Sequence, residues 1–438
     1  MPTRCLAQLV APVLILSLLL PPARADRPAI EQALTEMGRA VAAADPDAYL
    51  AHVSPSDVVF HAEQSNWAKD LRRIRPASVA FAIGEPPENA EPNGRGRDRV
   101  EEFGEKTARF ELVTTWTLAP AEGDGKPIER TVSFPVVFER TDDGRWLYAG
   151  EDWLVLQSDE PPARDERFQG VDPDSARAGQ PIRRQRGARV KYLPGYEAVA
   201  ERIVALLPLV REHVDEGFGG EVPRVQEVKL YPTMKHLQAS IYLSYTDGLS
   251  GWNEPGESIK LLTRPTASTR ALRSLLAHEY AHVATFELGP RSNDMPWWVL
   301  EGVAELSAER FVGGGKGKDA EAAVVRWHND DRLTPWADLA DFHTVARSLH
   351  RHVYKQGQHM MMFISDEFGR DARNQWMREM SDGKTIDQAT RAVMRMSFPD
   401  LDAKWRQAVK TLAEQAAATR AAKEQERRTN DAAPARVD

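Results

Sequence analysis

The sequence predicts an α+β protein of two domains, and three observations support this fold class. The chain has 438 residues, more than a single hydrophobic core usually organises. Its first part begins with a helical pattern and continues with alternating strand patterns, whereas its second part is mainly helical. A stretch rich in Asp, Pro, Gly and Arg separates the two parts, as expected for a linker.

The composition is that of a globular protein and excludes one class of partner. Hydrophobic residues make up 42% of the chain and charged residues 28%, which is typical of neither disordered nor membrane-spanning chains. The formal net charge is -8, so the chain lacks the basic excess that marks nucleic-acid binding. We therefore expect no nucleic-acid partner.

Residues 1–25 have the features of a secretory signal peptide. An apolar run, Leu9–Leu20, precedes a small-x-small end, Ala23–Ala25. The run is short for a membrane span, so we predict cleavage after Ala25 and no stable membrane insertion afterwards. A retained N-terminal anchor is the alternative. The mature protein is expected in the periplasm or outside the cell.

The only cysteine, Cys5, lies inside this segment. The mature protein therefore has no disulfide and no cysteine metal site. Any metal ion must be held by histidine and carboxylate side chains.

The first domain, predicted over residues 26–156, has one helix followed by strands. Helical spacing covers Ile30–Ala43, and strand-like alternation covers Arg109–Leu118, Arg130–Glu139 and Arg145–Ala149. A helix followed by a curved antiparallel sheet resembles the NTF2-like fold. That fold hosts both enzymes and binding modules, so the resemblance leaves the function of this domain open.

Three polar residues of the first domain could line such a sheet. They are His52, His61 and Glu63. We expect each to have a structural role rather than a chemical one.

The linker is predicted over residues 157–189, and its basic run, Arg183–Arg186, is interpreted as solvated. A second domain then covers residues 190–410. Its predicted elements are a helix over Glu197–Val214, strands over Glu227–Tyr231 and Ser258–Leu262, a helix over Arg270–Phe286, and mainly helices after Arg310. Residues 411–438 are predicted as a charged tail, part helix and part disordered.

One helix of the second domain contains the pattern HExxH, formed by His278, Glu279 and His282. Residues four apart on a helix share a face, so the two imidazoles can bind one Zn²⁺ ion. Glu279 lies beside that face, where its carboxylate can take a proton from a water molecule. We therefore predict His278 and His282 as metal ligands and Glu279 as the catalytic base.

A second helix is predicted to complete the metal site. It carries Glu301 and Glu305 on one face and follows the capping candidates Asn293 and Asp294 and the first-turn Pro296. A catalytic zinc ion needs a third protein ligand, and we assign Glu301 to this role. Glu305 is one turn away, where it can accept the free N–H of a ligating histidine. One zinc ion per chain is expected.

This arrangement resembles the gluzincin metallopeptidases. His282 is followed by 18 residues and then by Glu301, a spacing similar to that of the aminopeptidase N group. The resemblance implies a thermolysin-like zincin fold and hydrolysis of peptide or protein substrates. It also implies that Tyr354, which precedes Gln356-Gly357, stabilises the transition state. Amphipathic packing is the alternative for Tyr354.

The sequence departs from the aminopeptidase group in one motif. No GxMEN run, which would bind the free amino terminus of a substrate, precedes His278. We therefore expect an endopeptidase, in which Ser244–Gly251 and the strand Ser258–Leu262 form the edge of the cleft and pair with an extended peptide. The alternative function is a zinc-stabilised binding protein without turnover, although the presence of Glu279 argues against it.

Two other features are interpreted as structural. His350, His352 and His359 are expected in the core or at the surface, because the zinc ligands are complete without them. The glycine-rich run Gly313–Lys318 lacks the GxxxxGK spacing and the following Ser or Thr of a phosphate-binding loop. We interpret it as a connector.

Overall fold

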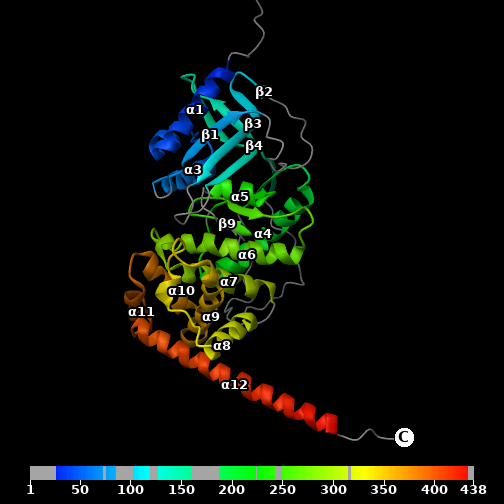
Figure 1. The fold of residues 1–438 in the computed structure, drawn as a ribbon, viewed down its shortest axis with the longest axis vertical. Helices are drawn as coiled ribbons and strands as arrows, with labels where there is room; N and C mark the ends of the chain where they lie inside the picture. Colours follow the sequence, from blue (N-terminus) through cyan, green and yellow to red (C-terminus); the bar gives the residue numbers. More distant parts are fainter. Residues whose placement is uncertain are drawn as a thin grey trace, which may run out of the picture.

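The computed structural model describes residues 26–72, 75–84, 102–118, 127–158, 187–222, 224–241, 249–313 and 317–432. In Figure 1 an N-terminal sheet with its helices lies at one end of the molecule, and the last helices lie at the other end. The described residues form helices and two β-sheets, so the predicted α+β class is confirmed. The predicted signal peptide lies outside the described residues.

The N-terminal unit, residues 26–153, packs helices against an antiparallel sheet. The helices are α1 (Arg27–Ala43), α2 (Pro46–Leu50) and α3 (Val58–Asp70), and the strands are β1 (Ser78–Ile83), β2 (Glu102–Phe103), β3 (Thr107–Leu118), β4 (Ile128–Arg140) and β5 (Trp146–Glu151). The order in the sheet is β1-β3-β4-β5, with β2 beside β3. Helices α2 and α3 begin where Asp45 and Asp57 accept hydrogen bonds from backbone N–H groups. The NTF2-like relationship stays a prediction.

The C-terminal unit, residues 154–432, begins with the second sheet. Its strands are β6 (Leu154–Ser158), β7 (Ala188–Tyr192), β8 (Gln226–Tyr231), β9 (Gly251–Trp252) and β10 (Ile259–Leu262). Their order is β6-β7-β8-β10-β9. Strands β7, β8 and β10 run parallel, and β9 is antiparallel to β10 at one edge.

The predicted linker limits, 157 and 189, each fall inside a strand. Gln157 and Ser158 extend β6 and pair with Arg189 and Ala188 of β7. Strand β6 therefore belongs to the second sheet, although the sequence placed most of it in the first domain. Pairing between segments about 30 residues apart is non-local, so periodicity does not reveal it. Residues 159–186, including the predicted basic run, lie outside the described residues.

Helices make up the rest of the C-terminal unit. They are α4 (Glu197–Phe218), α5 (Met234–Ile241), α6 (Thr269–Phe286), α7 (Trp297–Val312), α8 (Lys318–Asn329), α9 (His350–Phe368), α10 (Arg370–Ser381), α11 (Ile386–Met394) and α12 (Phe398–Ala432). Helix α12 extends away from the body of the molecule (Figure 1), through most of the predicted tail. Among the described helices, none has the length and apolar character needed to cross a membrane.

Helices α7 and α9 approach each other closely through two glycines. A Cβ atom on Gly302 would lie 2.7 Å from the carbonyl oxygen of Gly357, and one on Gly357 would overlap the carbonyl of Trp298. The missing side chains let the two backbones touch. This contact brings the first half of α9, with Tyr354, against the first half of α7, with Glu301.

The two units meet through buried charged residues. Lys229 of β8 is fully buried, and its Nζ lies 2.5 Å from Glu63 Oε2 of α3 and 3.1 Å from Glu151 Oε2 of β5. Lys191 of β7 and Asp57 of the N-terminal unit form a partly buried pair at 3.0 Å. Because removing one partner would leave a buried charge uncompensated, these pairs fix how α3 sits on the second sheet.

Candidate active site

Helix α6 presents His278 and His282 on the same side. The helix begins at Ser268, whose Oγ accepts a hydrogen bond from Ala271 N at 3.2 Å. Its opposite side is apolar and packs into the core, including Leu276. The periodicity of α6 therefore turns both imidazoles away from the core and toward α7.

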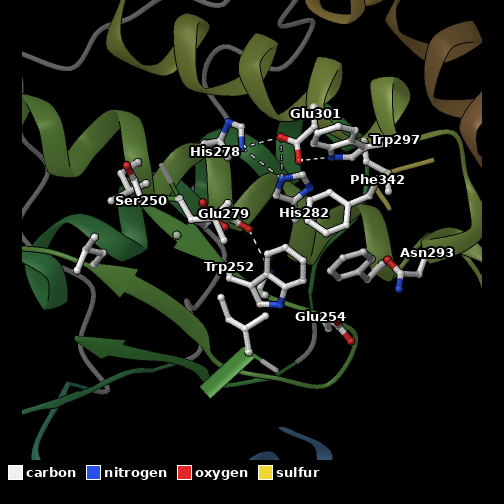
Figure 2. Close-up of a pocket in the computed structure, with 18 of the residues that line it drawn as sticks. Ser250, Trp252, Glu254, His278, Glu279, His282, Asn293, Trp297, Glu301 and Phe342 are labelled. Carbon is white, nitrogen blue, oxygen red and sulfur yellow. Dashed lines mark hydrogen bonds and ion pairs between the residues drawn. The ribbon is translucent and has the colours of Figure 1, made fainter. Parts of the chain in front are cut away.

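The side chains of His278, His282 and Glu301 point toward one another (Figure 2). Glu301 Oε2 lies 3.2 Å from His278 Nε2 and 3.6 Å from His282 Nε2, and the two Nε2 atoms are 3.3 Å apart. One nitrogen or oxygen from each residue lies within 4.8 Å of the others. The structure thus brings together the three ligands predicted from the sequence.

The two carboxylate oxygens of Glu301 have different surroundings. Trp297 Nε1 donates a hydrogen bond to Oε1 at 2.8 Å, which fixes the carboxylate. Oε2 is buried and faces the two imidazole Nε2 atoms, but it makes no well-aligned hydrogen bond with the described residues. A buried carboxylate oxygen without a donor is costly. A cation between this oxygen and the two imidazoles would remove the cost, so the donor set fits a metal ion.

Helix α7 begins differently from the prediction. Asn293 and Asp294 form a short 3-10 helix, η2 (Ser292–Asp294), and do not cap α7. Pro296 immediately precedes the first helical residue, and the N–H of Trp297 donates to Ala340 O at 2.8 Å. The backbone carbonyl of Ala340 therefore accepts a hydrogen bond from the start of α7, where the side chain of Asn293 or Asp294 was expected to be the acceptor.

Glu305 contacts the other nitrogen of His278. Its Oε1 lies 3.3 Å from His278 Nδ1, and its Oε2 accepts a hydrogen bond from Lys355 Nζ at 2.6 Å. Although burial opposes it, these contacts with His278 and Lys355 lower the pKa of Glu305 to about 2. Glu305 therefore stays ionised and orients the His278 ring with Nε2 toward Glu301.

The histidine and its acidic neighbours shift one another's pKa. Burial lowers the pKa of His278, but the carboxylates of Glu301 and Glu305 raise it well above its usual value. The pKa of Glu301 is lowered below its usual range because the two imidazoles outweigh its burial. Glu301 is therefore held in its anionic form, the form that can bind a metal ion.

Glu279 is buried beside this cluster, against the edge strand β9. Its side chain lies close to Gly251, where a Cβ atom would lie 2.8 Å from Glu279 Cγ. Asn253 Nδ2 donates to the backbone carbonyl of Glu279 at 3.3 Å. Burial raises the pKa of the Glu279 carboxyl above its ordinary value, which brings it nearer the range useful for proton transfer.

Tyr354 lies beside the cluster on α9. Its ring stacks near that of His278, with centroids 6.2 Å apart and planes at 25°, and it also contacts Trp297. Burial and the nearby carboxylates raise the pKa of its phenol well above the usual value. Tyr354 therefore remains a neutral hydrogen-bond donor at the wall of the site.

A cleft of about 1440 Å³ is lined by the predicted site residues His278, Glu279, His282, Glu301, Glu305 and Tyr354. The sequence predicted one edge of this cleft, and the prediction is correct in part. Strand β9 is the edge strand, and Leu249–Gly251 and Leu262 line the cleft, but β10 lies inside the sheet, between β8 and β9. Residues 244–248 lie outside the described residues. The edge is formed by β9 because β10 pairs on its other side with β8.

The N-terminal unit also contributes to the cleft. Asn66, Lys69 and Asp70, from the last turns of α3, line it together with the β9–β10 turn. Sequence analysis missed these residues and Asn253, and it did not predict the contact of Gly251 with Glu279. The pattern of α3 alone carries no signal that this helix reaches a site more than 180 residues away in the chain.

The other histidines are placed outside the cluster. His352 Nδ1 lies 2.9 Å from Thr334 Oγ1, and His359 Nδ1 accepts a hydrogen bond from Trp405 Nε1 at 2.9 Å. Both are buried, as expected for core residues. His350 contacts Trp297 edge-on.

The three polar residues singled out in the first domain are also outside the cleft lining. Glu63 pairs with Lys229, and His52 lies 3.5 Å from Glu36. His61 lies near Ser65 on the same helix. Of the glycine-rich run, residues 314–316 lie outside the described residues, and Gly317 precedes α8.

Comparison with known proteins gives a distant structural likeness. No family model matches the chain, and no curated protein matches its sequence. Among solved structures, an M1 zinc metallopeptidase from Deinococcus radiodurans is 14% identical, with a TM-score of 0.33 over 78% of this chain and 72% of that one. A mutant of that enzyme bound to a Tyr-Ser-Ala substrate is 12% identical, with a TM-score of 0.32 over 78% and 71%. Likeness at this level does not define a family, so the function is inferred from the residues of the site.

Proposed function

We propose that the chain is a zinc-dependent peptidase in which His278, His282 and Glu301 hold the metal ion and Glu279 is the catalytic base. One observation carries this proposal. Two imidazole nitrogens and an otherwise unpartnered carboxylate oxygen converge in a large cleft, with the Glu279 carboxyl beside them. Two histidines and one glutamate are a donor set of catalytic zinc sites, where a further position stays open.

The chemistry follows from the neighbours of this site. A bound zinc ion would polarise the scissile carbonyl and lower the pKa of a water molecule. Glu279 accepts the proton of the attacking water and then passes it to the amine that leaves. Tyr354 donates a hydrogen bond to the oxygen that gains negative charge. Glu305 holds the tautomer of His278 throughout.

Peptide or protein substrates suit the cleft, and internal cleavage is the proposed mode. The volume of about 1440 Å³ is larger than that of typical small-molecule pockets. The edge strand β9 along the cleft can pair with an extended peptide. The absence of a GxMEN run also supports an endopeptidase over an aminopeptidase. The protein is proposed to act after export, in the periplasm or outside the cell.

The first experiment is hydrolysis of a quenched casein substrate by the mature protein. We expect cleavage that a strong chelator abolishes and that added zinc restores. The Glu279→Gln variant should keep its zinc but lose about 10²–10⁴-fold in turnover, because the base is absent. Full activity in this variant would show that Glu279 is not the base.

A second substrate pair tests the mode of cleavage. A peptide with an acetylated amino terminus and its free-amine form should be cleaved at similar rates by an endopeptidase. Cleavage of the free-amine form alone would identify an aminopeptidase. Bound zinc without cleavage of any substrate would favour a metal-stabilised binding protein.

A further inference from the structure

We propose that α3 of the N-terminal unit is a positioning element of the active site, and that Asn66 is its key residue. This inference rests on the proposed function. The role assigned to the N-terminal unit is to hold the edge strand β9 in place against Glu279. Three sets of contacts connect α3 with the base.

The first set joins α3 to the turn between β9 and β10. Asn66 Nδ2 donates hydrogen bonds to Pro255 O at 3.3 Å and to Glu257 Oε1 at 3.0 Å. One turn earlier on α3, Glu63 Oε1 accepts hydrogen bonds from Ser258 N, at 3.3 Å, and from Ser258 Oγ. Glu63 and Asn66, which are three residues apart on α3, thus bind both the middle and the end of the β9–β10 turn.

The second set is steric. Gly256 has a φ of +85°, and a Cβ atom on it would lie only 3.3 Å from Ala62 Cβ of α3. This turn therefore packs directly on the helix, in a backbone conformation that favours glycine. A shift of the turn toward α3 is blocked, and the hydrogen bonds of Asn66 oppose a shift away from it.

The third set joins the same segment to the base. Asn253, the first residue after β9, donates to the backbone carbonyl of Glu279 at 3.3 Å. Gly251 of β9 lies against the Glu279 side chain. A displacement of the turn therefore changes the space available to the carboxylate, and rates are sensitive to misplacement of about 1 Å.

Buried ion pairs hold α3 and the β9–β10 turn in fixed positions. Glu63 pairs with the fully buried Lys229, and Glu257 pairs with the buried Lys260 at 2.9 Å. Replacing these residues would threaten the fold. Asn66 is only half-buried and uncharged, so it can be changed while the charged pairs stay intact.

The experiment compares three variants of the full mature protein loaded with zinc. Asn66→Ala removes both hydrogen bonds to the turn, and Asn66→Gln keeps an amide at this position. Ser65→Ala is the matched control, because it removes the hydrogen bond from Ser65 Oγ to His61 O, within α3 itself. Each variant is measured for zinc content, for kcat and KM, and for amide hydrogen exchange over residues 249–258.

For Asn66→Ala we expect faster exchange over residues 249–258, unchanged zinc content, and a kcat about tenfold lower with a smaller change in KM. Asn66→Gln should recover much of the loss, and Ser65→Ala should resemble the wild type. Unchanged exchange and kcat in Asn66→Ala would overturn the inference, as would an equal loss in Ser65→Ala.

The outcomes separate this inference from the proposed function. A wild-type protein that binds zinc but cleaves no peptide would overturn the proposed function and the effect of Asn66 on turnover. The exchange measurement needs no substrate, so it would still decide whether α3 holds the turn.

Discussion

In the proposed zinc site, Glu305 acts on His278 and is not itself one of the three proposed ligands. Its carboxylate lies 3.3 Å from His278 Nδ1 and is held on its other side by Lys355. A carboxylate in this position fixes the ring and makes the ligating nitrogen more basic. The orientation of His278 therefore depends on α7 and α9 as well as on its own helix.

Replacing Glu305 by alanine should weaken zinc binding by about 10–100-fold, because His278 loses the partner that orients it. Competition with a fluorescent chelator measures this change. Ser307→Ala, two residues further along α7, removes only a bond from Ser307 Oγ to the helix backbone and serves as the control. Equal zinc affinity in the wild type and in Glu305→Ala would refute the assigned role.

At the scale of elements, the site depends on how closely α7 and α9 approach. Gly302 and Gly357 lie at the crossing, where each would clash with the other helix if it carried a side chain. The glycines are costly within a helix. Their presence is explained by the contact that brings Tyr354 and Lys355 of α9 to Glu301 and Glu305 of α7.

Gly357→Ala should therefore destabilise the protein by about 1–3 kcal/mol through overpacking. Urea unfolding measures the change. Gly217→Ala is a suitable control, since Gly217 is in helix α4 and a Cβ atom there would meet nothing within 4 Å. Alanine at that position should be neutral or stabilising. A Gly357→Ala variant as stable as the wild type would mean that the helices can separate without loss.

The parts of the site that the sequence predicted are those set by local periodicity. Residues four apart on one helix must share a face, so His278 with His282, and Glu301 with Glu305, could be paired before the structure was known. The contact of Gly251 with Glu279 and the position of Asn66 depend on how distant segments pack. The same reason explains why the predicted first domain extended to residue 156, although residues 154–156 belong to β6 of the second sheet.

At the scale of the whole molecule, the two units share one cleft and one buried set of charges. Glu254 lies where they meet, in the β9–β10 turn and near Asp70 and Lys69 of α3. Burial, together with the charge of Glu257, raises the pKa of Glu254 to about 7. Folding therefore favours the protonated form of this carboxyl.

This shift predicts how stability changes with pH. The folded-state pKa of Glu254 lies above its unfolded value of 4.5, so the ionised form destabilises the fold above pH 7, and stability rises as pH falls toward 4.5. Glu254→Gln should be more stable than the wild type at pH 8 by about 1–3 kcal/mol, with a smaller difference at pH 5. Urea unfolding at both pH values measures this. Equal stability of the wild type and Glu254→Gln at pH 8 would contradict the raised pKa of Glu254.

The most direct test of the central claim is the zinc content of the purified mature protein, compared with that of Glu301→Ala. The proposed site predicts about one zinc ion per chain in the wild type and a large loss in the variant, because only two protein ligands remain. A wild-type protein without zinc, or a variant that binds zinc as tightly as the wild type, would contradict the assignment of His278, His282 and Glu301 as the metal site.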